Sequence, residues 1–211
     1  MELRHLITKL LDIGAGIYDP LLRMTVDEQK LRKKLIELAY LEGNEKVLDI
    51  GCGTGSFDLM VAKILDKGSV FGIDISSKMV EIAKGKAAQN VYKIDYRVGN
   101  STELPYNRKE FDVVFTSLMY HHLDYEEKRG TLCEIYRVLK EHGRYISVEF
   151  GEFPKDLFHR VIIGFTRSSG VLHGMYPDEL IEDAGFHVIN DGEGPVLAGH
   201  HQTKYRLLGK T

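Results

Sequence analysis

The sequence predicts an α/β fold, a doubly wound, mostly parallel sheet with helices on both faces. Short apolar runs alternate with amphipathic helical patterns after residue 43, and this alternation is typical of βαβ units. A glycine-rich loop at 51–55 directly follows the first apolar run, as expected where a strand turns into a helix. A chain of 211 residues can bury the core of one such domain, and no repeat or obvious linker divides it.

Two helices are expected before the sheet begins. In residues 2–16 the apolar side chains share one helical face, and two glycines end the pattern. A capping box of Thr25 and Glu28 opens the second helix, and Gly43 stops it. The inward face of this second helix carries Leu31, Leu35 and Leu38.

The rest of the chain is predicted to form seven strands and five further helices. The first five strands are 46–50, 70–74, 94–98, 111–116 and 144–150. The helices between them start after Gly55, after Ser76 and after Asp124. An apolar, partly aromatic segment at 151–176 is interpreted as an inserted helix and loop. A helix over 177–185 and two strands near 186–190 and 201–208 complete the fold.

The charge balance disfavours nucleic acid as a substrate. The chain has 28 Lys and Arg against 31 Asp and Glu, and neither sign forms a long run. Its two cysteines, Cys52 and Cys133, have no disulfide or zinc spacing, which favours a reduced, cytoplasmic protein. No run of about 18 apolar residues predicts a transmembrane segment, and the first residues lack the apolar block of a signal peptide.

The segment Asp49–Gly55 has the pattern D-x-G-x-G-x-G at the end of a strand. A dinucleotide loop has G-x-G-x-x-G, and its pyrophosphate would want no carboxylate there. An acidic loop suits a ligand end that carries an ammonium and a sulfonium. The pattern resembles motif I of the class I methyltransferases that use S-adenosylmethionine, which implies a cofactor site at Asp49, Gly51, Cys52, Gly53 and Gly55. The alternative is a tight glycine turn without a ligand.

A second acidic residue, Asp74, ends the second strand about twenty residues after the loop. A carboxylate there accepts hydrogen bonds from a ribose diol, in nicotinamide and adenosyl cofactors alike. We therefore expect Asp74 and its neighbour Ile75 to contact the nucleoside. Alternatively, Asp74 is an acid that opens the following helix.

Three further blocks resemble the same family, in particular its quinone and phospholipid methyltransferases. Gly99–Tyr106 is similar to the G-D-A-x-x-L-P-F/Y block, with Asn100 where the family has an acid. The resemblance implies that Asn100 and Ser101 contact adenine, while an ordinary Asn-Ser turn is the alternative. Phe111–Leu123, which includes Ser117 of the cofactor site, is similar to the F-D-x-V and H-H-L blocks. Val138–Gly143 is similar to V-L-K-P-G-G, although Glu141 and His142 depart from it.

The resemblance spans residues 45–150 and implies a seven-stranded sheet of order 3-2-1-4-5-7-6 with an antiparallel last strand. It divides the single domain into an N-terminal helical lid (1–43), a cofactor-binding core (44–150), an inserted substrate-side segment (151–176), and a C-terminal helix and strands (177–211). In this family a Y-D segment folds over the cofactor. Tyr18 would donate to the methionine carboxylate and Arg23 would pair with it, or both anchor the helix junction.

Methyl transfer is an in-line displacement, and a general base is needed only if the acceptor must lose a proton. The candidate catalytic residues are Tyr120, His121 and His122, which follow the fourth strand. Because neighbouring side chains point different ways, at most one of the histidines should face the acceptor. Packing or capping roles are the alternative for all three.

The predicted function is transfer of a methyl group from S-adenosylmethionine, with S-adenosylhomocysteine as product, to a small, lipophilic acceptor such as a lipid or quinone. Three readings compete with it. An NAD-dependent oxidoreductase fails on the glycine spacing and on Asp49, and no histidine set has metal-ligand spacing, so no metal is expected. A non-catalytic module that binds the cofactor stays open, as does the choice between monomer and homodimer.

Overall fold

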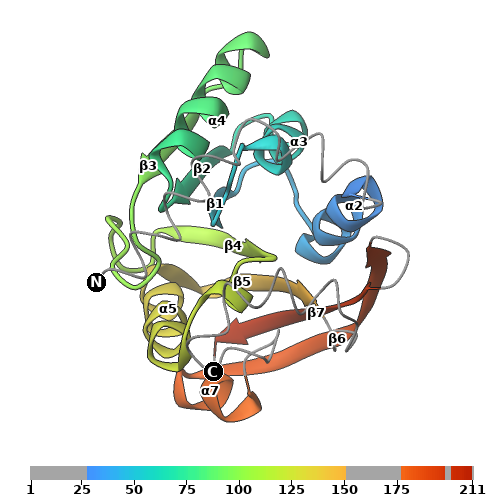
Figure 1. Ribbon diagram of the computed structural model, residues 1–211, viewed down its shortest axis with the longest axis vertical. Helices are drawn as coiled ribbons and strands as arrows, with labels where there is room; N and C mark the ends of the chain where they lie inside the picture. The colour runs from blue at the N-terminus through green and yellow to red at the C-terminus, as the bar shows by residue number, and fades with distance from the viewer. Residues whose placement is uncertain (1–27, 151–176, 198–200, 211) are drawn as a thin grey trace, which may run out of the picture.

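The protein forms one seven-stranded sheet in the computed structural model, which describes residues 28–150, 177–197 and 201–210 (Figure 1). The strands run in the order β3-β2-β1-β4-β5-β7-β6. β7 is antiparallel to both β5 and β6, and the other pairs are parallel. The expected order and antiparallel strand are therefore confirmed. The strands are β1 (Lys46–Ile50), β2 (Ser69–Asp74), β3 (Ile94–Val98), β4 (Phe111–Ser117), β5 (Leu139–Phe150), β6 (Phe186–Leu197) and β7 (His201–Lys210).

Helices cover both faces of this sheet. The described helices are α2 (Glu28–Ala39), α3 (Ser56–Ile64), α4 (Ser77–Gln89), α5 (Tyr125–Val138) and α7 (Asp178–Asp183), with a short 3-10 turn at Tyr120–His122. α2, α3 and α4 lie on one side of the sheet, and α5 and α7 lie on the other (Figure 1). No helix in these ranges is long and apolar enough to cross a membrane.

The strand pattern explains how one sheet serves two cores. Val47 packs in the cluster under α2 and α3, whereas the next residue, Leu48, packs in the cluster under α5 and α7. Val113 and Val114 divide in the same way. Successive side chains of a strand point to opposite faces, so a strand that is apolar throughout buries both. Each fully buried side chain of this kind contributes roughly 1.5–3 kcal/mol.

Two strands, β5 and β6, are longer than the sequence indicated by five residues or more. β5 begins at Leu139, where α5 ends, and Leu139 pairs with Phe111 of β4. Glu141 and His142 are exposed in this early part of the strand, so the departure from the family pattern leaves the sheet intact. β6 continues to Leu197 through two irregularities in its pairing with β7.

Several expected features lie outside the described residues. They are the helix at 2–16, the capping residue Thr25, the Tyr18 and Arg23 segment, and the insert at 151–176. The structure therefore leaves the proposed division into a lid and a substrate-side segment untested.

The fold brings the carboxyl ends of the parallel strands to one edge of the sheet. Ile50 pairs with Ile73, Asp74 with Val98, and Ser117 with Val148. The loops that follow β1, β2, β3 and β4 therefore share one rim of the molecule. In open α/β sheets ligands bind at this edge.

Candidate cofactor and acceptor site

The loop between β1 and α3 has a backbone that favours glycine at three positions. Gly51, Gly53 and Gly55 have φ angles of 77°, 53° and 72°, in the left-handed region. At Gly51 a side chain would also collide with Met119, because an added Cβ would lie 2.6 Å from its Cγ. The loop is therefore tightly turned and covered by the segment that follows β4.

The amide groups of this loop are largely occupied within the protein. Gly51 N and Cys52 N donate to the Ile73 carbonyl at 2.8 and 3.1 Å, and Gly55 N donates to the Cys52 carbonyl at 3.0 Å. Gly53 N donates to Asp74 Oδ2 at 2.9 Å. These four amides are thus not directed at a diphosphate, which argues against a dinucleotide loop of the NAD type.

Asp49 supplies the negative charge under the loop. It is 3% exposed, and burial, with a contribution from nearby Asp74, raises its pKa to about 7. The sequence analysis missed a second buried carboxyl, Asp58 in the first turn of α3, which is 0% exposed. Burial holds the pKa of Asp58 well above its ordinary range, and Asp49 raises it further. The sequence shows this residue only as an acid within the largely apolar segment Ser56–Ile64.

Asp74 connects the end of β2 to the glycine loop. Its Oδ2 accepts from Gly53 N, and its Oδ1 accepts from Ser76 N at 2.8 Å. Ser76 itself caps α4, because its Oγ accepts from Met79 N. A carboxylate has about four lone-pair sites, so it can accept more than two hydrogen bonds. Ile75, beside it, is 38% exposed.

Asn100 and Ser101 already have local partners. Asn100 Oδ1 accepts from Thr102 N at 3.2 Å, so the turn that the sequence analysis kept as an alternative is present. The Ser101 hydroxyl lies 2.8 Å from the Thr131 hydroxyl of α5. Both contacts are internal to the protein. They fix the loop after β3 against α5.

The segment after β4 turns sharply at Leu118, whose φ of 52° is unusual for a branched side chain. The turn aims the next two amides at one buried carboxylate of β5. Glu149 Oε1 accepts from Met119 N and from Tyr120 N, both at 2.7 Å. Glu149 is 0% exposed, and the sequence analysis did not single it out. In the sequence, Glu149 could have been noticed as an acid close to the carboxyl end of the strand predicted at 144–150, which was expected to be buried.

The same carboxylate holds one of the two candidate histidines. Glu149 Oε2 lies 3.0 Å from His121 Nδ1, and the His121 side chain is 19% exposed. The neighbouring His122 is exposed, with its ring centroid 3.9 Å from that of His121. Lys128 of α5 is buried close enough to Glu149 to interact with it, and burial lowers the pKa of this lysine.

Tyr120 differs from the two histidines. It is 0% exposed and belongs to the core cluster that includes Leu104, Leu132 and Ile135. The structure thus favours the packing role that the sequence left open, because a side chain that fills the core is poorly placed to meet an acceptor. Ser117, half-buried at the end of β4, stays at the rim with the glycine loop.

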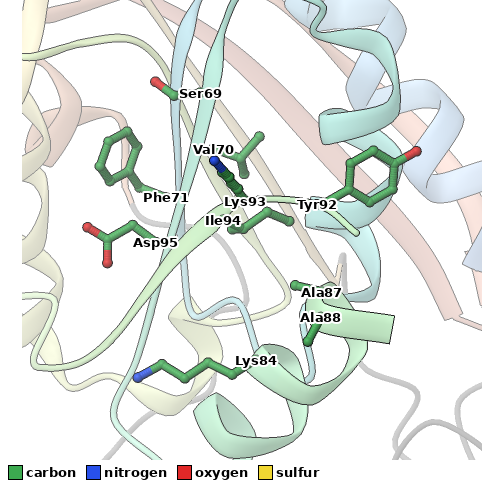
Figure 2. A pocket seen from close by; sticks show the side chains of 10 residues that line it. All are labelled: Ser69, Val70, Phe71, Lys84, Ala87, Ala88, Tyr92, Lys93, Ile94 and Asp95. Atoms are coloured by element: carbon green, nitrogen blue, oxygen red, sulfur yellow. The ribbon is translucent and has the colours of Figure 1, made fainter. Parts of the chain in front are cut away.

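A groove of about 470 Å³ lies elsewhere, between α4 and the amino ends of β2 and β3 (Figure 2). It is lined by Ser69, Val70, Phe71, Lys84, Ala87, Ala88, Tyr92, Lys93, Ile94 and Asp95. This is the end of the strands opposite to the glycine loop, so the groove is not part of the site described above. No group of three or more potential metal ligands gathers within the described ranges.

Comparison with known proteins agrees with this geometry. Residues 47–143 match the family model described as a methyltransferase domain. A demethylmenaquinone methyltransferase of Symbiobacterium thermophilum is 31% identical over 153 residues, which cover 70% of this chain and 60% of that protein. The matches span less than two thirds of the length of this and the next three curated relatives.

Solved structures share the fold at low sequence identity. Geranyl diphosphate C-methyltransferase from Streptomyces coelicolor, bound to S-adenosylhomocysteine, has a TM-score of 0.71 at 14% identity and covers 87% of this chain and 79% of that one. The [4+2]-cyclase SpnF has a TM-score of 0.69 at 19% identity, with 85% and 80% covered. The glycine loop, the sheet order and the family match together identify residues 47–143 as a methyltransferase domain with the class I fold, and the curated relatives of the chain include demethylmenaquinone methyltransferases.

Proposed function

We propose that the protein transfers a methyl group from S-adenosylmethionine to a small, lipophilic acceptor. The observation that carries the proposal is the loop after β1, whose amides are engaged within the protein while buried Asp49 lies beneath it. Such a loop offers negative charge to a cationic ligand. It does not offer the amide cradle that a diphosphate requires.

The residues at the rim fit the parts of this cofactor. Asp74, which ends β2 at this rim and bonds to the glycine loop, would accept from the ribose hydroxyls. Asp49 and the loop Gly51–Gly55 would hold the methionine end, whose ammonium is positive. Asn100 and Ser101 are the candidates for the adenine edge, and Tyr18 for the methionine carboxylate.

The bound cofactor would supply a methyl group on a positively charged sulfur, from which it leaves without its bonding electrons. The protein's part is to orient the acceptor and to receive a proton. His121 suits the second task, because a carboxylate at Nδ1 requires the proton on that nitrogen and leaves Nε2 with its lone pair free. Nε2 would take the proton that the acceptor loses as its oxygen or carbon gains the methyl group.

This arrangement favours an acceptor that carries an acidic proton, such as a phenol, a hydroquinone or an enol. Glu149, with three hydrogen-bond donors at its two oxygens, fixes the histidine as a buried carboxylate does in other base dyads. The similarity to a demethylmenaquinone methyltransferase supports an acceptor of this chemistry. It also supports an enzyme over a module that only binds the cofactor.

The cofactor assignment is tested by calorimetric titration with S-adenosylhomocysteine. We expect binding to the wild type and a loss of roughly tenfold or more for Asp74→Asn, because a hydrogen bond to a charged acceptor contributes about 1.5–3 kcal/mol. Asp95→Asn is the matched control, since Asp95 pairs with Arg97 at the start of β3, away from the rim. No binding by the wild type would refute the proposal, and equal binding by Asp74→Asn would refute the ribose contact.

A further inference from the structure

Two aspartates lie buried together beneath the glycine loop. Asp49, on β1, is 3% exposed, and Asp58, in the first turn of α3, is 0% exposed. Each acts on the pKa of the other by direct interaction, so their carboxyl groups are neighbours. Both oxygens of Asp58 and Oδ1 of Asp49 lack a hydrogen-bond donor in the part of the chain that the structure describes.

The missing donor has a simple physical explanation. Ionised carboxylates only accept hydrogen bonds, so two of them side by side cannot bond to each other. Burying both charges without partners would cost far more than burying one. A single proton resolves the problem, because it turns one carboxyl into a donor and leaves the other as its acceptor.

The surroundings show which member should keep the proton. Asp58 is the more buried of the two, and Asp49 raises its pKa further. Burial raises the pKa of Asp49 as well, to about 7, but hydrogen bonding to Asp58 opposes that rise. The other titratable or charged groups that face the pair are Asp74 of β2, Tyr96 of β3, Cys52 of the loop and Arg32 of α2.

None of these neighbours replaces the proton. The Tyr96 hydroxyl donates to the Gly55 carbonyl over a long 3.4 Å; its hydrogen bonding to Asp58 lowers the pKa of that aspartate, but burial, the larger cause, still raises it. Cys52 is itself a buried thiol. Burial raises the pKa of Cys52, so it stays a neutral thiol and adds no charge to the pair. Arg32 lowers the pKa of both aspartates but does not cancel the effect of burial on either one.

We propose that Asp58 is a positioning residue that keeps its proton at neutral pH and donates it to Asp49, so that the pair presents one negative charge to the cofactor loop. The inference rests on the proposed function, because a cationic methyl donor is the ligand whose affinity this charge would set. If both carboxyl groups were ionised, their charges would repel each other in the dry interior. If neither were ionised, the pair would not attract the ammonium of the ligand.

The proton is tested first in the free protein, without any ligand. Carbon-13 spectra of protein labelled at its aspartates follow the carboxyl groups between pH 5 and 9, and Asp49→Asn and Asp58→Asn assign the two signals. We expect Asp58 to keep its proton to a higher pH than Asp49, which should titrate near 7. An Asp58 carboxyl that is already ionised at pH 5, as an ordinary aspartate is, would overturn the proposal.

The effect on the loop is tested by S-adenosylhomocysteine affinity over the same pH range. Asp58→Asn keeps a neutral donor, so its affinity should follow the wild-type pH profile. Asp58→Leu removes the donor, so its affinity should fall roughly tenfold at pH 7 and its profile should move to higher pH. Asp183→Asn on α7 is the charge-matched control, because Asp183 is exposed on the other face of the sheet. The ligand's own ammonium titrates equally in every titration and cancels in the ratios.

The outcomes separate this inference from the proposed function. If the wild type binds S-adenosylhomocysteine but the affinity of Asp58→Asn depends on pH in a different way, Asp58 is ionised in the wild type. That result would overturn this inference and leave the proposed function standing. If Asp58→Leu does not fold, the spectra and Asp58→Asn still decide. If the wild type binds no S-adenosylhomocysteine at any pH, the proposed function fails, while the carbon-13 titration continues to decide whether the pair shares a proton.

Discussion

Glu149 is the residue on which the proposed chemistry depends most, although it does not face the acceptor. It accepts from two backbone amides and from His121, and so fixes both the loop and the histidine tautomer. Glu149→Gln would place an amide NH₂ against Nδ1 and force the proton onto Nε2, which could then no longer accept one. We expect kcat to fall about 10²- to 10⁴-fold.

Two readouts separate this role from a structural one. The affinity for S-adenosylhomocysteine should stay close to the wild-type value in Glu149→Gln, and His121→Gln should lose a similar fraction of kcat. Because the pair acts as a unit, the double variant should lose little more than either single one. Additive losses, or a parallel loss of cofactor affinity, would contradict a Glu149–His121 dyad.

Asp58 gives a prediction about stability that needs no ligand. Its pKa is raised on folding, so the folded state keeps a proton that the unfolded state releases above about pH 4. Stability is therefore lost as the pH rises. Asp58→Asn removes this loss, so its Tm should exceed that of the wild type at pH 8, with a smaller difference at pH 5. Thermal unfolding at both pH values checks this, and a difference independent of pH would contradict it.

At this scale the sequence revealed the residues that belong to a recognisable pattern. Asp49 and Asp74 follow from the glycine spacing and from the end of the second strand. Asp58 and Glu149 belong to no such pattern, and only burial and hydrogen bonding in the folded chain set them apart. Tyr120 was misleading, because adjacency to a histidine pair says nothing about which side chain fills the core.

Among the elements, the glycine loop makes the strictest demand on the sequence. Gly51 and Gly53 both have positive φ, but only Gly51 lies against a side chain, that of Met119. Gly53→Ala should therefore cost about 1–2 kcal/mol for the left-handed backbone alone. Gly51→Ala should cost roughly a further 1–3 kcal/mol because the added Cβ overlaps Met119.

Urea unfolding of the two alanine variants measures this difference directly. Displacement of Met119 in Gly51→Ala should also disturb the segment that Glu149 holds, whereas Gly53→Ala has open space around the new carbon. Equal destabilisation of both variants would show that backbone strain alone sets the cost. A more stable Gly51→Ala would contradict the packing of Met119 over the loop.

Most strands were predictable because apolar runs and flanking turns mark them. β1 and β3 have the expected bounds, while β2 and β4 each differ by a single residue at one end. The early part of β5 was missed because Lys140–Gly143 is polar and contains a glycine, yet it extends the strand from the end of α5. β6 was cut short for a similar reason: its Gly194 and Pro195 indicate a turn, but an edge strand tolerates them at an irregularity.

For the molecule as a whole, periodicity alone gave the parallel, doubly wound part of the sheet. The antiparallel β7 and the order of the last strands came from the resemblance to the methyltransferase class. Periodicity could not supply them, because an apolar strand carries no mark of its direction. Residues 151–176, which the sequence predicts to lie on the substrate side, are outside the described structure.

The fold does not by itself determine the reaction. A methyltransferase and a [4+2]-cyclase are both structural neighbours of this chain, with TM-scores of 0.71 and 0.69. The assignment to methyl transfer therefore rests on the loop, on Asp49 and Asp74, and on the match over residues 47–143. The lipophilic acceptor is a further step, supported by the quinone methyltransferase relative and by the histidine dyad.

The most direct test is to incubate the protein with methyl-labelled S-adenosylmethionine and a lysate of the source organism, and then to partition the products between organic and aqueous phases. We predict label in the organic phase with the wild type and little label with Glu149→Gln. Label confined to the aqueous phase would contradict a lipophilic acceptor. Cofactor binding without label in either phase would contradict methyl transfer itself.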